Sequence, residues 1–529
     1  MRWFETRGPV YPEDNYFVAR RDELSDFVKR IERGRYIVLF APRQTGKTTL
    51  FRNAIDVLEN RESAYFPIHL NFEGYVDSDA TTFYSSLCEE ICKQIKNVFQ
   101  NRQKDPSDRL SRFLESAEIT EHISMRRFFE DLGSLLEAQR FVMIIDEFDG
   151  IPQDAIRGFL HSLRHIYLSG RDRCPHSVGI VGVKSITQLN YDRSISPFNI
   201  QDEFKLPNFT PKQVQELFSQ YTDEVGQPFT PETIEAIHKQ TAGQPVLINR
   251  FAQILTEELD IPKSEPITME HFSEAHIQLL REGHTNIDHL ITNIRRDRHF
   301  EALLMKIASY DEGVRFSLYN EHINELATYG VIAEGADGMC EIINPIYHYC
   351  IMQAFKPIVN GLEQEYLPED SHEGFQDYLT PDGKIQMTAL LDNFRDFIAR
   401  AGFKILQVPD TPQEYVGQHL LFAYLDQFVQ SVGGTMYLEV RTGRGRMDIL
   451  ILHRNQKYIV ETKIWGGETR YQAGKAQLAA YVKLEGAEDG YYVVFDHRNT
   501  PEPRVETETL DGLTIRSYVI PVIQERPSD

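Results

Sequence analysis

Residues 36–50, YIVLFAPRQTGKTTL, constrain the fold more than any other stretch of the chain. The apolar, β-branched run at 37–40 predicts a buried strand, a tight loop follows it, and KTTL opens a helix. Strand, loop and helix form the context of a P-loop, in which backbone N–H groups and the positive end of the helix bind phosphate. The expected nucleotide contacts come from consecutive residues: Ala41, Pro42, Arg43, Gln44, Thr45, Gly46, Lys47, Thr48 and Thr49.

Two of these residues have specific roles in the pattern G-x-x-x-x-G-K-[ST]. Lys47 is expected to reach the β- and γ-phosphates of ATP, and the Thr48 hydroxyl is expected to bind Mg²⁺. Ala41 stands where the pattern has its first glycine, which restricts the turn slightly but adds only a methyl group. The departure therefore leaves the prediction of a phosphate-binding loop in place.

A second buried strand is predicted at residues 141–149, FVMIIDEFD, and it ends in two adjacent carboxylates. Acids at the end of an apolar strand are costly unless a metal ion or ligand meets them. We expect Asp146 to hold the Mg²⁺ shell and Glu147 to orient or deprotonate the attacking water. Together, the loop and the acidic strand predict an ATP-hydrolysing domain.

Composition limits the remaining possibilities. The 529 residues suffice for three or four domains, and five cysteines are too few for a disulfide framework, which favours a cytoplasmic protein. The sequence contains no apolar run of membrane-spanning length, so no membrane contact is expected. The net charge of −23 means that any contact with nucleic acid must be local.

The pattern along residues 21–205 is that of an α/β domain. A helix at 22–32 precedes the P-loop strand, and further strands at 64–70 and 177–183 alternate with helices at 79–100, 122–138 and 153–169. This alternation predicts a parallel sheet covered on both faces, preceded by an N-terminal arm at 1–20. The polar stretch at 101–116 is expected to be a surface excursion. Ser185, after the last strand, is either a γ-phosphate sensor or the cap of the next helix.

From residue 206 the pattern becomes helical, and a family resemblance becomes specific. The segments APRQTGKTT, MIIDEFD, SPFNI (196–200) and TAGQPVLINR (241–250) resemble AAA-like, STAND-type P-loop ATPases over about residues 20–260. The resemblance implies a helical lid at 206–295, with Gly243 and Pro245 near the adenine, and regulation through a homo-oligomer. Arg250 is either a second sensor or part of a solvated helix face. Arg157 and Arg164 are either arginine fingers or part of a solvated helix face.

Residues 296–360 predict a small winged-helix module, and 361–384 an acidic linker. The would-be recognition helix, YNEHINELATYG, carries Glu321 and Glu325 but no lysine or arginine. Because these carboxylates would repel phosphates, we interpret this module as a packing or oligomerisation element.

The C-terminal domain, at 385–529, has a second candidate site. Two helices, at 385–401 and 412–432, precede three strands at 435–441, 447–452 and 457–464. A hairpin brings Asp448 beside Glu461 and Lys463, which share one face because side chains alternate along a strand. Asp448 and Glu461 are expected to bind Mg²⁺ (Mn²⁺ is a second candidate), with the Thr462 carbonyl as a third ligand. Lys463 would position the water or stabilise charge on the scissile phosphate.

This arrangement resembles the PD-(D/E)xK nuclease superfamily over about residues 386–500, although Met447 replaces the proline. The resemblance implies an α/β restriction-endonuclease-like fold and cleavage of nucleic acid, with DNA as the expected substrate. Glu414 corresponds to the superfamily's N-terminal acidic residue, and Gln477 and Tyr481 match its Q-x-x-x-Y element.

Local charge agrees with a nucleic-acid site. Residues 441–475 contain eight basic residues and three acids, and two of those acids are the expected metal ligands. Trp465 and Tyr471 lie in the same stretch and either stack on bases or pack in the core.

The leading hypothesis is an ATP-binding and ATP-hydrolysing regulatory module, a switch rather than a motor, that controls a metal-dependent nuclease, and analogy places it in bacterial defence against foreign DNA. Two alternatives remain open at this point. One is an ATP-dependent signalling scaffold that binds nucleic acid without cutting it, and the other is a DNA-remodelling or transposition-type ATPase. The sequence identifies neither a protein partner nor an activating trigger.

Overall fold

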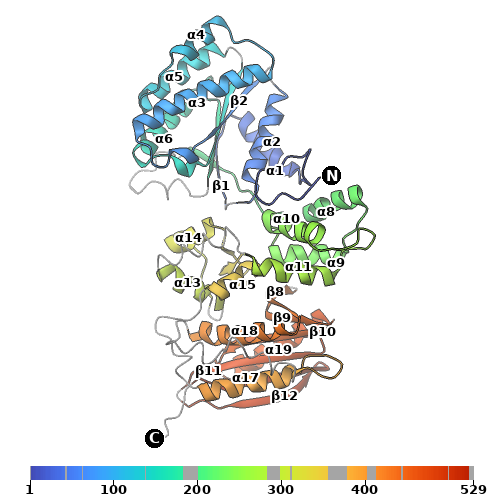
Figure 1. Ribbon diagram of the computed structural model, residues 1–529. Helices are drawn as coiled ribbons and strands as arrows, with labels where there is room; N and C mark the ends of the chain where they lie inside the picture. The colour runs from blue at the N-terminus through green and yellow to red at the C-terminus, as the bar shows by residue number, and fades with distance from the viewer. Residues whose placement is uncertain are drawn as a thin grey trace. The chain divides into compact units, whose positions relative to one another are not determined.

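The computed structural model (Figure 1) describes residues 2–41, 44–61, 64–136, 139–182, 200–282, 298–309, 313–354, 378–401, 413–442, 445–454, 456–498 and 500–522. The chain divides into two compact units. The first contains Met1–Val225, Gln244–Arg250 and Thr328–Gly330, and the second contains the remainder. Among the described helices, none is both long and apolar enough to cross a bilayer.

A five-stranded parallel sheet forms the centre of the first unit, as the alternating pattern predicts. Its strands stand in the order β2 (Tyr65–Asn71), β3 (Arg140–Asp146), β4 (Ser177–Gly182), β1 (Tyr36–Phe40), β5 (Gln201–Glu203). Since all five run in the same direction, the carboxyl ends of β1 and β3 meet at one edge of the sheet. The P-loop and Asp146 therefore lie at the same edge.

Helices cover both faces of this sheet because successive side chains of each strand point in opposite directions. Ile37 and Leu39 of β1 pack with one group of helices, α1 (Arg21–Glu32) and α2 (Lys47–Glu59). Tyr36 and Val38 of the same strand pack into the opposite core. That core is built on α3 (Ala80–Asn101), α4 (Asp108–Ser116), α5 (His122–Leu135) and α6 (Gln153–Leu168).

The predicted surface excursion at 101–116 is mostly exposed, but it contains a helix that the prediction missed. Residues Asp108–Ser116 form α4, and the side chain of Ser107 caps the helix by accepting a hydrogen bond from the Leu110 backbone N–H. Leu110 and Leu114, one turn apart, are buried in the core. Together with Phe113, which is partly buried against the same core, these apolar side chains anchor the short helix, although the remaining positions are polar.

Lid helices follow the sheet in the chain. Helix α8 (Pro211–Val225) and the start of α10 (Pro245–Gln253) belong to the first unit. The second unit contains α9 (Pro231–Thr241), the π-helical turn η3 (Ile254–Glu258), α11 (Met269–Arg281), α13 (Arg298–Ser309), α14 (Glu321–Thr328), the hairpin of β6 (Ile332–Glu334) and β7 (Cys340–Ile342), and α15 (Pro345–Ala354).

The C-terminal part of the second unit is an α/β region built on a six-stranded sheet. The strand order is β12 (Arg504–Leu510), β13 (Leu513–Pro521), β11 (Asp489–Asp496), β10 (Gln456–Ile464), β9 (Gly445–His453), β8 (Thr435–Thr442). Strands β10, β11 and β13 are parallel, and the outer pairings are antiparallel. Its helices are α17 (Met387–Ala401), α18 (Gln413–Ser431) and α19 (Glu468–Glu485).

Candidate functional site

The P-loop joins β1 to α2 as its pattern predicts. Gly46 precedes α2 with a φ of +87°, a left-handed conformation that glycine adopts without strain. The Lys47 side chain is only 7% exposed, and its Nζ donates a hydrogen bond to the Ala41 carbonyl at 2.6 Å. The ammonium is therefore folded back inside the loop. Pro42 and Arg43 lie outside the described residues, as does Ser185.

The acidic strand meets the P-loop helix at the edge of the sheet. Asp146 is buried, and its Oδ2 accepts a hydrogen bond from the Thr48 hydroxyl at 3.2 Å. Glu147 follows with a φ of +49°, a conformation that is strained for a side chain other than glycine. Strain of this kind is common at functional sites. The Thr48 hydroxyl and the Asp146 carboxylate are oxygen donors of the type that Mg²⁺ prefers.

A glycine fixes the turn that follows the acids. A Cβ atom at Gly150 would lie 2.0 Å from the Phe72 carbonyl oxygen, so any larger residue would displace the backbone. This close approach joins the turn after β3 to the turn after β2, where the Phe72 N–H also donates to the Asp146 carbonyl at 3.0 Å. The backbone around the two acids is thereby held from both strands.

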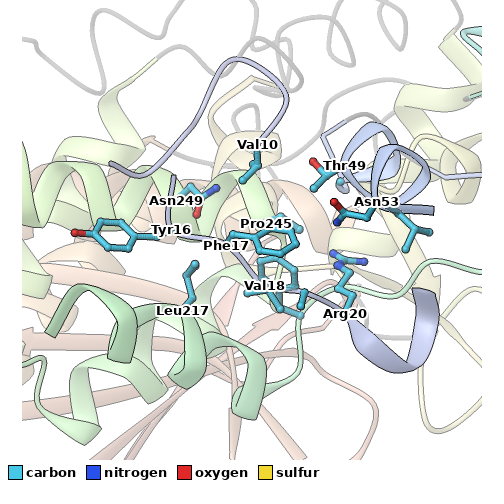
Figure 2. A pocket seen from close by; sticks show the side chains of 14 residues that line it. Val10, Tyr16, Phe17, Val18, Arg20, Thr49, Asn53, Leu217, Pro245 and Asn249 are labelled. Atoms are coloured by element: carbon cyan, nitrogen blue, oxygen red, sulfur yellow. The ribbon is translucent and has the colours of Figure 1, made fainter. Parts of the chain in front are cut away.

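A pocket of about 460 Å³, part of it open to solvent, lies beside the P-loop helix within the first unit (Figure 2). Three predicted nucleotide contacts, Gly46, Thr49 and Pro245, line it. Gly243 falls in the second unit, so its predicted place near the adenine stays a prediction. The other lining residues, which sequence reasoning missed, are Val10, Tyr16, Phe17, Val18, Ala19, Arg20, Leu50, Asn53, Phe209, Leu217 and Asn249.

Arg20 is the cation among these lining residues, and it connects the P-loop to the segment that leads into the lid. Its two terminal nitrogens donate to the Thr45 carbonyl at 3.0 Å and the Pro207 carbonyl at 2.9 Å. Its guanidinium also lies 4.6 Å from the centre of the Phe209 ring. Burial lowers the pKa of Arg20 to about 10, so the group remains charged at neutral pH. The fork geometry of arginine suits this double contact, which a lysine could not reproduce.

Asn249 provides a test of whether an adenine base fits the pocket. Its Nδ2 donates to the Glu5 carbonyl at 2.8 Å, which fixes the orientation of the amide. The Oδ1 is buried, and no donor in the described part of the chain reaches it. A buried acceptor without a donor costs about 1–3 kcal/mol. The amino group of adenine is a donor of the kind this oxygen lacks, so the pocket lining is compatible with the base.

The second cluster lies on the hairpin of β9 and β10, where Asp448, Glu461 and Lys463 come together as predicted. The Asp448 carboxylate accepts hydrogen bonds from the Thr462 backbone N–H at 2.7 Å and the Thr462 hydroxyl at 2.9 Å. Lys463 Nζ lies 3.5 Å from Glu461 and 3.9 Å from Asp448. Glu461 is only 1% exposed, whereas the side chains of Asp448 and Lys463 are 18% and 26% exposed. One side of the cluster is therefore accessible.

The predicted Q-x-x-x-Y element lies on α19. Gln477 Nε2 donates to the Tyr481 hydroxyl at 2.6 Å, and this hydroxyl accepts from the Arg446 backbone N–H at 3.0 Å. The element thus contacts β9 two residues before Asp448. Glu414 lies on α18, but its side chain is outside the described residues. The described residues contain no group of three or more His, Cys, Asp or Glu side chains that could hold a metal ion. The hairpin therefore offers two carboxylates, those of Asp448 and Glu461.

The local excess of basic charge is smaller in the structure than the sequence window indicates. Lys475 is buried and paired with Glu506 and Glu508, and Lys457 is paired with Glu485. These acids lie on β12 and at the end of α19, outside residues 441–475. The Tyr471 side chain is buried and donates to Ser517 at 2.7 Å, which favours core packing over base stacking. The Trp465 ring lies under two arginines, with the guanidinium carbons of Arg498 and Arg504 at 4.6 and 5.2 Å from its centre.

Comparison with known proteins gives results for both parts of the chain. Residues 386–499 match a domain of unknown function, DUF8371. No curated protein matches the chain. A Walker-type ATPase of Pyrococcus abyssi, paby2304, is similar at 18% identity, covering 66% of this chain and 99% of that one, with a TM-score of 0.46.

Two other solved structures are similar at lower TM-scores. The Aeropyrum pernix ORC1 protein, solved in complex with DNA, has 15% identity and a TM-score of 0.33, covering 64% of this chain and 92% of that one. The Thermotoga maritima RuvB Holliday junction branch migration motor has 16% identity and a TM-score of 0.33, covering 64% and 95%.

The family match is more extensive. The model of the AAA-like domain matches residues 5–344, which is more than half of the chain, and it includes the P-loop, the acidic strand and the pocket. This match supports P-loop ATPase function and the binding of a nucleotide with Mg²⁺. The chain belongs to the AAA-like domain family.

Proposed function

We propose that this protein is an ATPase whose nucleotide state controls a metal-dependent nuclease in the same chain. The observation that carries the nuclease half is the meeting of Asp448, Glu461 and Lys463 on one accessible hairpin. The ATPase half is supported by the family match and by the contact of Thr48 with Asp146.

In the first unit, each residue has a defined task. Lys47 would bind the β- and γ-phosphates, and the backbone N–H groups of the loop would surround them. Thr48 and Asp146 would hold Mg²⁺, which neutralises charge on the phosphates when bound. Glu147 would accept a proton from the attacking water. The pocket lined by Thr49, Arg20 and Asn249 would take the base.

In the second unit, Asp448 and Glu461 would hold Mg²⁺ or Mn²⁺, which supplies a nucleophilic water and polarises a phosphate when bound. Lys463 is near enough to both carboxylates to stabilise charge that develops on the scissile phosphate. We take DNA as the polynucleotide substrate. The partial exposure of the Asp448 and Lys463 side chains supports contact with a strand, whereas a closed interior would not.

Contacts within the second unit offer a route for control. Helices α11 and α15 pack against β8, the edge strand that pairs with β9 and thus with the strand of Asp448. The His276 ring of α11 lies 4.7 Å from the Tyr437 ring of β8. Burial lowers the pKa of His276 to about 3, so this contact is between neutral rings at physiological pH. A shift of α11 would therefore act directly on the nuclease sheet.

The remaining parts of the proposal are the homo-oligomer, a cytoplasmic location, and a role in defence against foreign DNA. The homo-oligomer rests on the resemblance of the sequence to STAND-type ATPases. The role in defence rests on analogy of domain combination.

Replacing the proposed base tests the ATPase half. Glu147→Gln should lower the rate of ATP hydrolysis by roughly 10²–10³-fold, because an amide cannot accept the proton of the attacking water. ATP binding should be retained, since no phosphate contact is removed. Phosphate release in single-turnover conditions and retention of labelled ATP on the protein measure the two effects.

The exposed Glu130 of α5 provides a matched control, and Glu130→Gln should hydrolyse ATP at the wild-type rate. Hydrolysis by Glu147→Gln at an unchanged rate would contradict the role assigned to Glu147. For the nuclease half, cleavage of plasmid DNA by the full chain is the direct assay.

A further inference from the structure

The N-terminal arm forms part of the pocket wall, and it is a folded element. Trp3 and Asn15 form a β-bridge, and the Tyr16 N–H donates to the Trp3 carbonyl at 3.1 Å. Phe4 and Tyr16 are both buried, with ring centres 4.6 Å apart. The arm thus forms a loop whose two ends run side by side in the same direction. Val10, within this loop, and residues 16–20 line the cavity (Figure 2).

Aromatic contacts fasten the arm to the lid helix α8. The Phe4 ring lies 6.0 Å from Phe218 and 5.9 Å from Tyr221, and the Tyr16 ring lies 5.7 Å from Tyr221 in an edge-on arrangement. Burial of these rings supplies most of the attachment, because aromatic side chains contribute large apolar areas. This attachment is not directional enough to set the arm's register on the helix.

Gln220 of α8 supplies the directional contact. Its Nε2 donates to the Phe17 carbonyl at 2.7 Å, and its Oε1 accepts from the Phe17 N–H at 3.2 Å. One amide therefore satisfies both backbone groups of a single pocket-lining residue. Only a side chain with a donor and an acceptor side by side can do this, so glutamate, with two acceptors, cannot. Arg2 adds a donor to the same Oε1 at 3.3 Å and pairs with Glu224.

The arm is also fastened at two further points around the pocket. Asn249 of α10 donates to the Glu5 carbonyl, and Arg20, at the end of the arm, donates to the Thr45 carbonyl in the P-loop. The arm therefore connects two lid helices to the phosphate-binding loop. These partners are far apart in sequence, and the pocket takes its form only when the arm joins them.

We propose that residues 2–20 act as a clasp that forms the base-binding wall of the nucleotide pocket, and that Gln220 is the positioning residue that holds the clasp in register. This inference rests on the proposed nucleotide site. The P-loop would bind phosphates through its own backbone and Lys47, whereas the arm lines the pocket together with Thr49 and Asn53. Release of the clasp at Phe17 leaves the Arg20 contact to the P-loop in place, and therefore weakens recognition of the base but not of the phosphates.

The test compares two ligands on the full chain by calorimetry, ATP and inorganic tripolyphosphate, both with Mg²⁺. In Gln220→Glu, the second carboxylate oxygen faces the Phe17 carbonyl in place of a donor. We expect ATP affinity to fall about tenfold, and tripolyphosphate affinity to stay at the wild-type value. Gln215→Glu, an exposed position on the same helix, makes the same change of charge and should bind both ligands as the wild type does.

Limited trypsin digestion gives a second measurement that does not depend on affinity. ATP should protect the exposed Arg7 of the arm in the wild type and in Gln215→Glu, but not in Gln220→Glu. Equal ATP affinity in Gln220→Glu and the wild type would overturn the inference, and so would an equal loss for ATP and tripolyphosphate, which indicates a general structural defect. A wild-type chain that binds neither ligand would instead overturn the proposed function, on which this inference rests.

Discussion

Lys47→Ala is expected to reduce ATP affinity by at least about a hundredfold and to remove hydrolysis. The Lys47 ammonium is folded inside the loop, 2.6 Å from the Ala41 carbonyl, and bound phosphates would meet this cation there. Charge-assisted contacts to phosphate are about twice as strong as neutral hydrogen bonds, and in a buried loop they are weakly screened. Binding of a fluorescent ATP analogue and steady-state phosphate release measure the two losses.

Lys93→Ala is the control for Lys47→Ala. Lys93 lies on α3 with a side chain that is 67% exposed, so its removal should change neither binding nor hydrolysis. Thermal unfolding of each variant shows whether the fold is intact. If folded Lys47→Ala binds ATP within about threefold of the wild type, the P-loop is not the nucleotide site.

Lys463→Ala should reduce plasmid cleavage by at least about a hundredfold, because it removes the cation that faces both carboxylates of the hairpin. ATP hydrolysis should stay within about twofold of the wild type, since Lys47, Thr48 and Asp146 belong to the other unit. Asp448→Asn should have the same pair of effects, because an amide is a poor ligand for Mg²⁺. Supercoiled plasmid, with Mg²⁺ or Mn²⁺, reports the cleavage rate.

The exposed Lys483 of α19 is the matched control, and Lys483→Ala should cleave plasmid at the wild-type rate. Loss of ATP hydrolysis in Lys463→Ala would contradict the separation of the two sites. Cleavage that persists in both Lys463→Ala and Asp448→Asn would show that the hairpin is not the nuclease centre.

Features that depend on short stretches of chain could be predicted from the sequence. The P-loop and the acidic strand each lie within a few residues, and the parallel sheet follows from the alternation of strands and helices. The meeting of Asp448 with Glu461 follows from a tight hairpin, because its antiparallel register pairs their chain neighbours, Ile449 and Val460, with each other. In each case the spacing in the sequence sets the spacing in the structure.

Features that depend on distant parts of the chain could not be predicted. The pocket wall joins Arg20 to Pro207 and Glu5 to Asn249, and no local pattern in the sequence indicates which distant carbonyl a side chain will meet. The basic charge expected from residues 441–475 is overestimated for the same reason, since the acids that neutralise Lys475 come from β12. The signals that the sequence did carry for the pocket were local ones, the P-loop residues Gly46 and Thr49 and the turn at Pro245.

The central claim is that nucleotide in one unit controls cleavage by the other. The most direct measurement is nicking of supercoiled plasmid by the full wild-type chain with Mg²⁺, in the presence and absence of ATP. The account predicts nicking whose rate differs at least about fivefold between the two conditions, and a difference that disappears in Lys47→Ala. Nicking at equal rates with and without ATP would contradict the control, and no nicking with any metal ion or nucleotide would contradict the nuclease itself.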